Sequence, residues 1–215
     1  FGSEGMGLRA DNLKVHVMVA AWEWPSYMSP EAQEKGIKVK LSPFRRQVRN
    51  RIASAKVNGN YVTSIVALNE AISQGYDEAL MLDYEGYVAE GSGENIFIVS
   101  DGRLQTPDLD ACLDGITRRT IIDLAKELGI ETEERKLILE DIFTAEEVFF
   151  TGTAAEVVPI NSLDDRTTEL ISTQLSFLKL FCSEDLYDGW SDYKAVIFEM
   201  ADDRGIIGDE IEDID

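Results

Sequence analysis

The sequence has few of the residues that build metal centres or disulfide frameworks. Its 215 residues include two cysteines, Cys112 and Cys182, and a single histidine, His16. Two cysteines do not make the framework of a small secreted domain, so we expect a reducing cytoplasm. A lone histidine between valines is more often a packed or rim residue than a ligand, and no cluster has metal-ligand spacing. We therefore expect no metal site.

Basic residues and long apolar runs are also scarce. The chain has 20 Lys and Arg against 41 Asp and Glu, which gives a formal net charge of -21. A general binder of the nucleic-acid backbone needs a basic face, so this charge argues against nucleic acid as a partner. No apolar run is long enough to cross a bilayer, and no cationic leader precedes an apolar stretch, so we expect no membrane partner.

What the chain does have is the composition of a globular protein, with 44% hydrophobic residues. It begins with Phe1 rather than methionine, which indicates processing or a piece of a longer protein. Twelve acids lie between Phe181 and Asp215, against only Lys194 and Arg204. We interpret this stretch as a solvated acidic tail that aids solubility, and a docking tail for a basic partner is the alternative.

Alternation of apolar and polar residues predicts most of the strands. The expected strands cover residues 14–20, 36–41, 78–83, 87–90, 95–100 and 147–151, and a further one passes through 157–158. Asp101-Gly102 is a turn signal that closes the strand at 95–100. A basic run with Arg45, Arg46, Arg49 and Arg51 follows the second strand. Such a run can face anionic substrates, but a solvated loop is more common, and we expect one here.

Three stretches have the apolar spacing of amphipathic helices. They cover residues 58–75, residues 117–128 and a stretch that begins at about Thr168. Gly75 and Gly129 suit the left-handed position that ends a helix. The residues expected to face inward are, in order, Tyr61, Ile65, Leu68 and Ile72, then Ile121, Leu124 and Leu128, then Ile171, Leu175 and Leu178.

Two segments offer an amine and an acid. In Ala55-Lys56-Val57-Asn58-Gly59-Asn60-Tyr61, a lysine precedes a turn-prone pair and an aromatic residue. If a cleft desolvates this lysine, its pKa falls and the free amine can form a Schiff base; a solvated lysine is the alternative. In residues 85–97, two glycines flank Ser92 directly after Glu90, so the backbone can approach a flat ligand. An ordinary glycine-rich loop is the alternative there.

Two further segments offer hydroxyl groups and free amides. Asp114-Gly115-Ile116-Thr117-Arg118 opens a helix and can hold an anion, unless the threonine is a plain N-cap. Thr151-Gly152-Thr153-Ala154-Ala155 follows a buried strand and offers a second set of donors. A lysine, an acid and two phosphate loops are what pyridoxal 5'-phosphate requires for its aldehyde, its ring nitrogen and its phosphate.

At these motifs the sequence resembles the branched-chain amino acid aminotransferases, which are pyridoxal phosphate enzymes of fold type IV in the class IV aminotransferase family. Lys-x-x-Gly-Asn-Tyr, Glu-Gly-x-Gly-Glu-Asn-x-Phe, Gly-Ile-Thr-Arg and Gly-Thr-Ala-Ala-Glu occur in the family's order within residues 5–159. The resemblance implies an α+β fold, a mixed-sheet pseudo-barrel with flanking helices, over residues 1–195. The acidic tail expected at 196–215 has no counterpart that we recognise in the family. The resemblance also implies a homodimer that moves an amino group between leucine, isoleucine or valine and 2-oxoglutarate.

The resemblance assigns cofactor roles to individual residues. Lys56 would form the Schiff base and also move the proton from the substrate Cα to the cofactor C4′. Glu90 would pair with the pyridine nitrogen, and Tyr61 would hydrogen-bond the ring hydroxyl. The phosphate would be held by Ile116 through its amide, by Thr117 and by Thr153.

The substrate side is implied in the same way. The Thr153 and Ala154 amides would lie near the substrate carboxylate. Trp24 and Tyr27 match the aromatic wall of the family's side-chain pocket. The alternative is that these two residues are an aromatic pair packed in the protein core.

The sequence also departs from the family's pattern. Family members have a smaller N-terminal domain, which supplies an arginine to the cofactor phosphate, and we expect that the residues from Phe1 onward do not include it. Family members also have a glycine-rich loop, which is shortened here near Asp165. A D-amino acid aminotransferase, an aminodeoxychorismate lyase or a non-catalytic remnant of the fold are therefore alternatives. Gly93-Glu94-Asn95 favours the branched-chain enzymes, because the D-amino acid enzymes tend to carry serines there.

Overall fold

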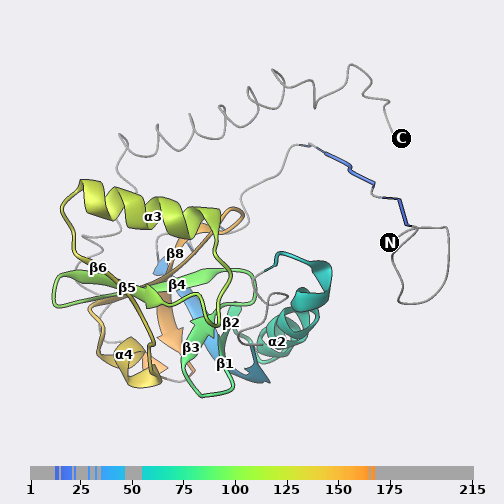
Figure 1. Cartoon of the computed structure of the whole chain (residues 1–215). Helices are drawn as coiled ribbons and strands as arrows, with labels where there is room; N and C mark the ends of the chain where they lie inside the picture. Colours follow the sequence, from blue (N-terminus) through green and yellow to red (C-terminus); the bar gives the residue numbers. More distant parts are fainter. Residues whose placement is uncertain are drawn as a thin grey trace. The chain divides into compact units, whose positions relative to one another are not determined.

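A computed structural model describes residues 13–14, 16–20, 22, 29, 32, 35–46, 55–164 and 166–167. The chain divides into two compact units, one of Ser26–Ser183 and one of Phe1–Pro25 with Glu184–Asp215. All the helices and strands assigned to the described residues belong to the first unit (Figure 1). The helix expected from Thr168 and the boundary expected at residue 195 lie outside the described residues.

The strands of the described part form one nine-stranded mixed sheet. Its order is β3-β2-β1-β8-β7-β4-β5-β6, and β9 pairs with β8. β1 runs parallel to β2 and β8, and β5 runs parallel to β6, whereas the other pairs are antiparallel. The strands are β1 (Ile37–Arg45), β2 (Glu78–Leu82), β3 (Val88–Glu90), β4 (Asn95–Ser100), β5 (Arg103–Pro107), β6 (Thr132–Arg135), β7 (Glu147–Gly152), β8 (Glu156–Leu163) and β9 (Arg166–Thr167).

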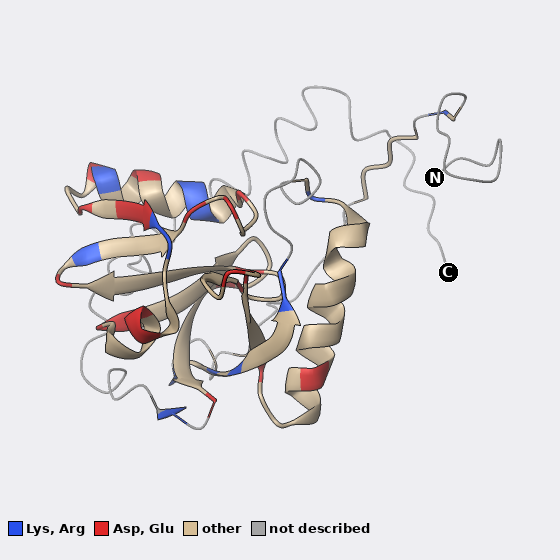
Figure 2. Cartoon of the chain, turned by 60° about the horizontal axis from the view of Figure 1, so that its bottom comes forward, with Lys and Arg blue, Asp and Glu red and all other residues tan. Residues whose placement is uncertain are grey.

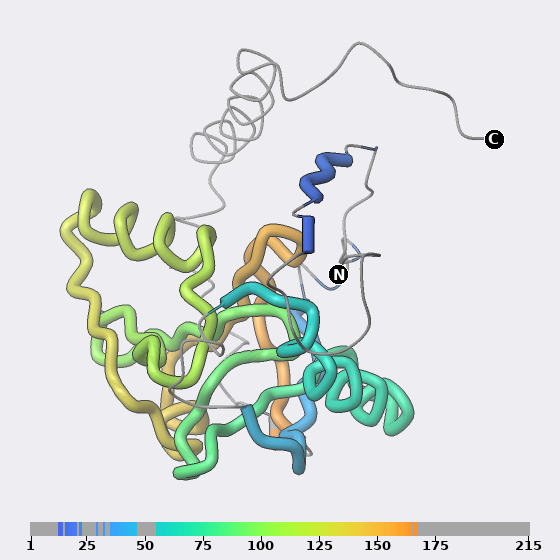
Figure 3. The backbone as a smooth tube through the Cα atoms, turned by 45° about the vertical axis from the view of Figure 1, so that its right-hand side comes forward, coloured from blue at the N-terminus to red at the C-terminus, as the bar shows by residue number. Residues whose placement is uncertain are grey.

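Short helices flank this sheet. They are η1 (Asn58–Asn60), α2 (Tyr61–Ser73), α3 (Ile116–Glu127) and α4 (Leu139–Thr144). α2 packs on β1 and β2, α3 packs on β6 and β7, and α4 packs on β4. In the views of Figures 1 and 3, α2 and α3 lie well apart, with strands between them. The mixed sheet with flanking helices confirms the fold class expected from the sequence.

Successive side chains of a strand point to opposite faces of the sheet, and this alternation divides the core into two main parts. Ile96 and Ile98 of β4 belong to the largest apolar cluster, which also contains residues of β1, β2, β7, β8 and α4. The intervening Phe97 and Val99 point to the other side, where they join residues of α3. There Phe97 stacks on Phe149 of β7, with ring centroids 5.4 Å apart. Because both faces of the central strands are covered, these strands read as nearly continuous apolar runs.

The strand expected at residues 14–20 is wrong for the residues that are described. Lys14 and residues 16–20 adopt no regular structure. Val17 and Met18 expose 86% and 88% of their surface. A strand requires a hydrogen-bonded neighbour, and no described residue pairs with this segment. Alternation of β-branched residues was therefore not sufficient to predict a strand.

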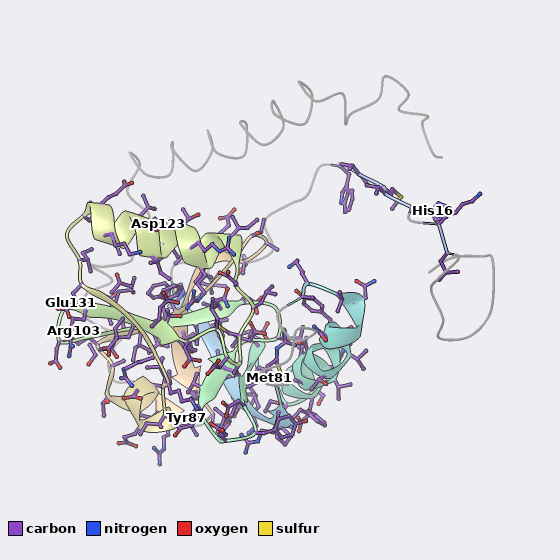
Figure 4. The ribbon with its side chains drawn as sticks, viewed as in Figure 1. His16, Met81, Tyr87, Arg103, Asp123 and Glu131 are labelled. Carbon is purple, nitrogen blue, oxygen red and sulfur yellow. The ribbon has the colours of Figure 1, made fainter. Side chains whose placement is uncertain are left out.

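The apolar face expected for the first helix is also wrong. Ile65 and Ile72 of α2 are more than half exposed. The buried side consists instead of small residues, Ser64, Ala67 and Ala71. Ala67 and Ala71 pack on Ala79 and Met81 of β2, and Met81 is labelled in Figure 4. Small side chains let the helix backbone approach the sheet closely, so the branched residues face outward.

Other elements agree with the sequence at their ends or in part. α2 ends at Ser73, with Gln74 as its C-cap residue before Gly75, and α3 ends at Glu127, two residues before Gly129; both glycines have positive φ. Leu128 was expected to face inward but is 47% exposed, because it is the C-cap residue of α3. β5 and β6 were not predicted. β6 is a strand of mostly exposed polar residues at one end of the sheet, so it has no apolar alternation to detect.

Two further features are not found among the described residues. No helix there is long and apolar enough to span a membrane. No group of three or more His, Cys, Asp or Glu side chains in that part of the chain is placed to hold a metal ion.

Candidate active site

All four segments singled out in the sequence contribute to one cavity of about 390 Å³. Lys56 precedes η1, Gly93 lies between β3 and β4, Thr117 lies in the first turn of α3, and Thr153 follows β7. The sheet order explains why they meet, because β4 pairs with β7 and α3 packs on β7. The volume is within the range of sites for small ligands and cofactors.

Two residues that line this cavity have buried hydroxyl groups with no hydrogen-bond partner within the described part of the chain. These groups are the Oγ1 atoms of Thr117 and Thr151. α3 begins at Ile116 after Gly115, with no side-chain cap, so Thr117 is not the N-cap residue. The first amides of a helix also lack partners within the helix. A buried polar group without a partner costs about 1–3 kcal/mol, and an anion at this helix end would satisfy several donors together. The residues present therefore fit a phosphate group.

Asn95 fixes the loop that leads into α3. Its side-chain nitrogen donates a hydrogen bond of 2.8 Å to the carbonyl of Leu113. Its side-chain oxygen occupies the space that a Cβ atom on residue 115 would need. The φ of Gly115 is −69°, which any residue adopts. Glycine is therefore required here by contact with Asn95 and not by backbone conformation.

Lys56 and Tyr61 lie together at the edge of the cavity. The Nζ atom of Lys56 donates a hydrogen bond of 3.1 Å to the Tyr61 hydroxyl oxygen. Lys56 is exposed, so the desolvation expected from the sequence is not found in the described part of the chain. The described residues do not cover this side of the cavity. Tyr61 lines a second cavity of about 270 Å³, which it shares with Ser92 and Ala154.

Arg46 is a site residue that the sequence analysis missed. It is 7% exposed, and its Nε lies 2.5 Å from Oε1 of Glu90. A second nitrogen of Arg46 donates to the carbonyl of Asn60, and the Leu113 amide donates to Glu90 Oε2. Burial raises the pKa of Glu90, while the positive charge of Arg46 opposes that rise. The solvated loop expected for the basic run is thus wrong at Arg46, and Arg49 and Arg51 lie outside the described residues.

The cavity also has a charged pair at its rim. Arg119 lines the cavity and forms a two-pronged ion pair with Asp114. Hydrogen bonding to Arg119 holds the pKa of Asp114 below its usual range. Figure 2 shows residues of both signs along α3, whereas α2 carries almost no charge. Asp114 thus lies beside the anion site with its negative charge already paired.

A family model described as amino-transferase class IV matches residues 1–163. The chain belongs to the class IV aminotransferases. It is 58% identical over 167 residues to the branched-chain-amino-acid aminotransferase of Pseudomonas aeruginosa PAO1, which covers 77% of this chain and 54% of that protein. It is 45% identical over 166 residues to the enzyme of the same name from Escherichia coli K12, covering 76% and 54%.

Solved structures support the same assignment. The T.th. branched-chain amino acid aminotransferase with pyridoxamine 5'-phosphate gives a TM-score of 0.68 at 44% identity, over 74% of this chain and 52% of that one. The Escherichia coli enzyme gives a TM-score of 0.64 at 45% identity, over 69% and 48%. The chain therefore spans about half the length of these relatives, and its fold is that of the class IV aminotransferases.

The predicted site residues of this class IV aminotransferase chain fall into four groups. Lys56, Ile116, Thr117 and Thr153 line the main cavity. Tyr61 and Ala154 line the second cavity. Glu90 is buried against Arg46 and Leu113. Trp24 and Tyr27 lie outside the described residues. The sequence signal that could have pointed to Arg46 was Glu90 itself, because an acid in an apolar strand needs a cationic partner.

Proposed function

We propose that this chain carries the cofactor-binding part of a branched-chain amino acid aminotransferase that uses pyridoxal 5'-phosphate. The main support is the pair of buried hydroxyls of Thr117 and Thr151, unpartnered among the described residues, in the same cavity as Lys56. When bound, this cofactor supplies an electron sink for the negative charge that develops at the substrate Cα. Both bacterial relatives are named branched-chain-amino-acid aminotransferases, which supports the branched-chain assignment.

The phosphate end of the site would be held by residues of two segments that line the main cavity. Thr117 would donate its hydroxyl, and Ile116 would donate its backbone amide at the N-terminus of α3. Thr153 would add a donor from the turn after β7. The chain is strongly acidic, so these local dipoles must hold an anion against the overall negative field. This requirement explains why the site uses amides and hydroxyls at a helix N-terminus.

Lys56 would hold the cofactor through its Nζ, and once the substrate amine has displaced that Nζ, the free amine would serve as the base at the substrate Cα. Tyr61 lies within hydrogen-bond distance of the same Nζ, so it would orient this nitrogen. The Tyr61 hydroxyl would also be the partner of the cofactor's ring hydroxyl.

Glu90 would accept a hydrogen bond from the ring nitrogen, and the positive charge of Arg46 favours the ionised form of its carboxyl group. Each carboxylate oxygen has two acceptor positions. Leu113 and Asn95 both donate to Oε2, whereas, among the described residues, Arg46 alone contacts Oε1, so Oε1 retains capacity for the ring.

The substrates we propose are leucine, isoleucine and valine, with 2-oxoglutarate as the amino acceptor. The amides of Thr153 and Ala154 bind the substrate carboxylate, and Trp24 and Tyr27 form the wall of the side-chain pocket. We further propose that residues 1–195 form the large domain, that residues 196–215 are an acidic tail, and that the protein is a cytoplasmic homodimer.

Absorbance spectroscopy tests this proposal against its alternatives. The full chain mixed with pyridoxal 5'-phosphate should gain the near-visible band of a lysine-bound cofactor, and Lys56→Ala should lack it. Added leucine should remove the band, and 2-oxoglutarate should restore it. Loss of the band with D-alanine alone would favour a D-amino acid enzyme. A band that no amino acid removes would favour a non-catalytic remnant.

A further inference from the structure

Two glutamates are buried side by side next to the candidate site. Glu78 of β2 is 1% exposed, and Glu94, just before β4, is 7% exposed. Their carboxyl groups accept hydrogen bonds from adjacent residues of one loop, Glu78 from Ser92 and Glu94 from Gly93. Among the described residues, neither carboxyl group forms a salt bridge with a Lys or Arg. Two adjacent buried carboxylates cannot both be ionised at low cost, so a proton must lie between them.

The surroundings decide which of the two carries that proton. Glu78 accepts hydrogen bonds from the Ala79 amide at 2.6 Å, the Ser92 amide at 3.2 Å and the Ser92 hydroxyl at 3.0 Å. Glu94 accepts only one backbone bond from the described residues, from the Gly93 amide at 3.0 Å. Three donors stabilise a negative charge on Glu78. Glu94 is therefore the protonated partner and donates to Glu78.

The electrostatics agree with this assignment. Burial, together with the negative charge of Glu78, raises the pKa of Glu94 to about 8. Glu90 on β3 adds a smaller effect of the same sign, although its own charge is paired with Arg46. From the α2 side, Tyr61 lines the same small cavity as Glu94. On β2, burial also raises the pKa of Glu78, and its hydrogen bonds oppose that rise.

The pair holds the loop between β3 and β4. Glu78 binds Ser92 twice, and Glu94 binds Gly93 through its side chain and Gly91 through its backbone carbonyl. Gly93 lines the main cavity beside Lys56. Ser92 and Gly93 also line the second cavity. The loop therefore forms part of the wall of both cavities.

We propose that Glu78 and Glu94 share one proton and act as a positioning pair, which holds the Ser92-Gly93 loop against the cofactor cavity. The part of this inference that concerns the cofactor rests on the function proposed above. When Glu94 loses its proton at alkaline pH, the two charges repel, and the loop loses its anchor. Neither residue is proposed to touch the cofactor or the substrate.

The predicted direction of the pH effect follows from linkage. A carboxyl group whose pKa is higher in the folded chain than in the unfolded chain keeps an extra proton when folded. Its stabilising effect is lost as pH rises from the unfolded value of 4.5 through the folded value of about 8. Glu94→Gln keeps a donor toward Glu78 but cannot ionise. Glu127→Gln is the matched control, because Glu127 is exposed near the end of α3.

Thermal unfolding of the full chain without cofactor measures this effect. From about pH 6 to about pH 9.5, the midpoint of wild type and of Glu127→Gln should fall by roughly 5 °C more than that of Glu94→Gln. Parallel curves for Glu94→Gln and wild type would overturn the proposal. If Glu94→Gln fails to fold, wild-type infrared spectra decide. A protonated carboxyl band should be present at neutral pH and disappear through about pH 8, and its absence at neutral pH would refute the shared proton.

Titration with pyridoxal 5'-phosphate tests the positioning role. The affinity of wild type should fall between about pH 7 and about pH 9 more steeply than that of Glu94→Gln. Equal slopes would overturn the positioning role. If the thermal and infrared results hold but no form binds the cofactor at any pH, the proposed function fails, while the shared proton is supported.

Discussion

Thr117 and Thr151 are polar residues that the described structure leaves unsatisfied inside a cavity. In an isolated chain, such hydroxyls lower stability, since they lose water and gain no partner. With an anion bound, the Thr117 hydroxyl at the helix end contributes to affinity instead. The two residues therefore link the stability of the empty chain to the binding of its ligand.

Thr117→Val should affect stability and binding in opposite directions. The variant keeps the shape of the side chain and removes the unpartnered hydroxyl, so the empty chain should be unchanged or about 1 kcal/mol more stable. Its affinity for pyridoxal 5'-phosphate should fall about tenfold, which corresponds to roughly 1.4 kcal/mol. Denaturant unfolding and absorbance titration measure the two effects. Unchanged affinity would mean that Thr117 does not hold the phosphate.

Arg46 and Glu90 form the buried ion pair closest to the chemistry. Arg46→Met should leave the Glu90 charge buried without its partner, which typically costs about 3–5 kcal/mol. Denaturant unfolding measures this loss. Arg103→Met is the matched control, because Arg103 is partly exposed and its ion pair with Glu133 is long, at 3.9 Å. Equal stability of the two variants would show that Glu90 does not depend on Arg46.

Gly115→Ala should distort the approach to α3. The added methyl group meets the side-chain oxygen of Asn95, which its bond to Leu113 holds in place. Overpacking of this kind costs about 1–3 kcal/mol, and we expect weaker cofactor binding as well. Gly59→Ala has open space around its new methyl group and serves as the stability control. If the two variants unfold at the same denaturant concentration, the contact with Asn95 is not restrictive.

At the scale of elements, α2 shows why helical periodicity predicted the wrong buried face. Its branched residues recur at helical spacing, so they predicted an inward stripe. The sheet beneath the helix instead receives Ser64, Ala67 and Ala71, which have the same spacing but little apolar surface. Periodicity identifies a helix and its repeat. It does not show which of two plausible faces is buried when one face is made of small residues.

Substitutions on the two faces of α2 test this orientation. Ala67 is fully buried, so Ala67→Leu should overpack the contact with β2 and lower the free energy of unfolding by about 1–3 kcal/mol. Ile65→Ala removes an exposed side chain and should change it by no more than about 0.5 kcal/mol. Denaturant unfolding compares the two. A larger loss of unfolding free energy in Ile65→Ala than in Ala67→Leu would show that the face predicted from the sequence is the buried one.

For the whole molecule, local sequence motifs identified the segments that line the main cavity, while the roles of their residues stay predictions. Lys56, Thr117 and Thr153 lie in short motifs of a few residues, and these motifs meet in one cavity. The exposed edge strand β6 and the ion pair of Arg46 with Glu90 were missed. Neither has a local pattern: the strand lacks apolar alternation, and the two ion-pair partners are brought together by the pairing of β1, β2 and β3.

The acidic composition of the whole chain determines how an anionic ligand can bind. A net charge of -21 opposes an anionic cofactor and anionic substrates, so binding must rely on local donors at the helix end and on Lys56. The described cavity offers such donors, and Asp114, the acid that lines it, is paired with Arg119. The site is therefore locally favourable to anions within an acidic protein.

Borohydride trapping is the most direct test of whether Lys56 holds pyridoxal 5'-phosphate covalently. The full chain is mixed with the cofactor, reduced with borohydride, digested and mapped by mass spectrometry. We expect a single phosphopyridoxyl group, located on Lys56, and a large loss of label in Thr117→Val at limiting cofactor. Absence of label on Lys56, or label spread evenly over the exposed lysines such as Lys126, would contradict this expectation.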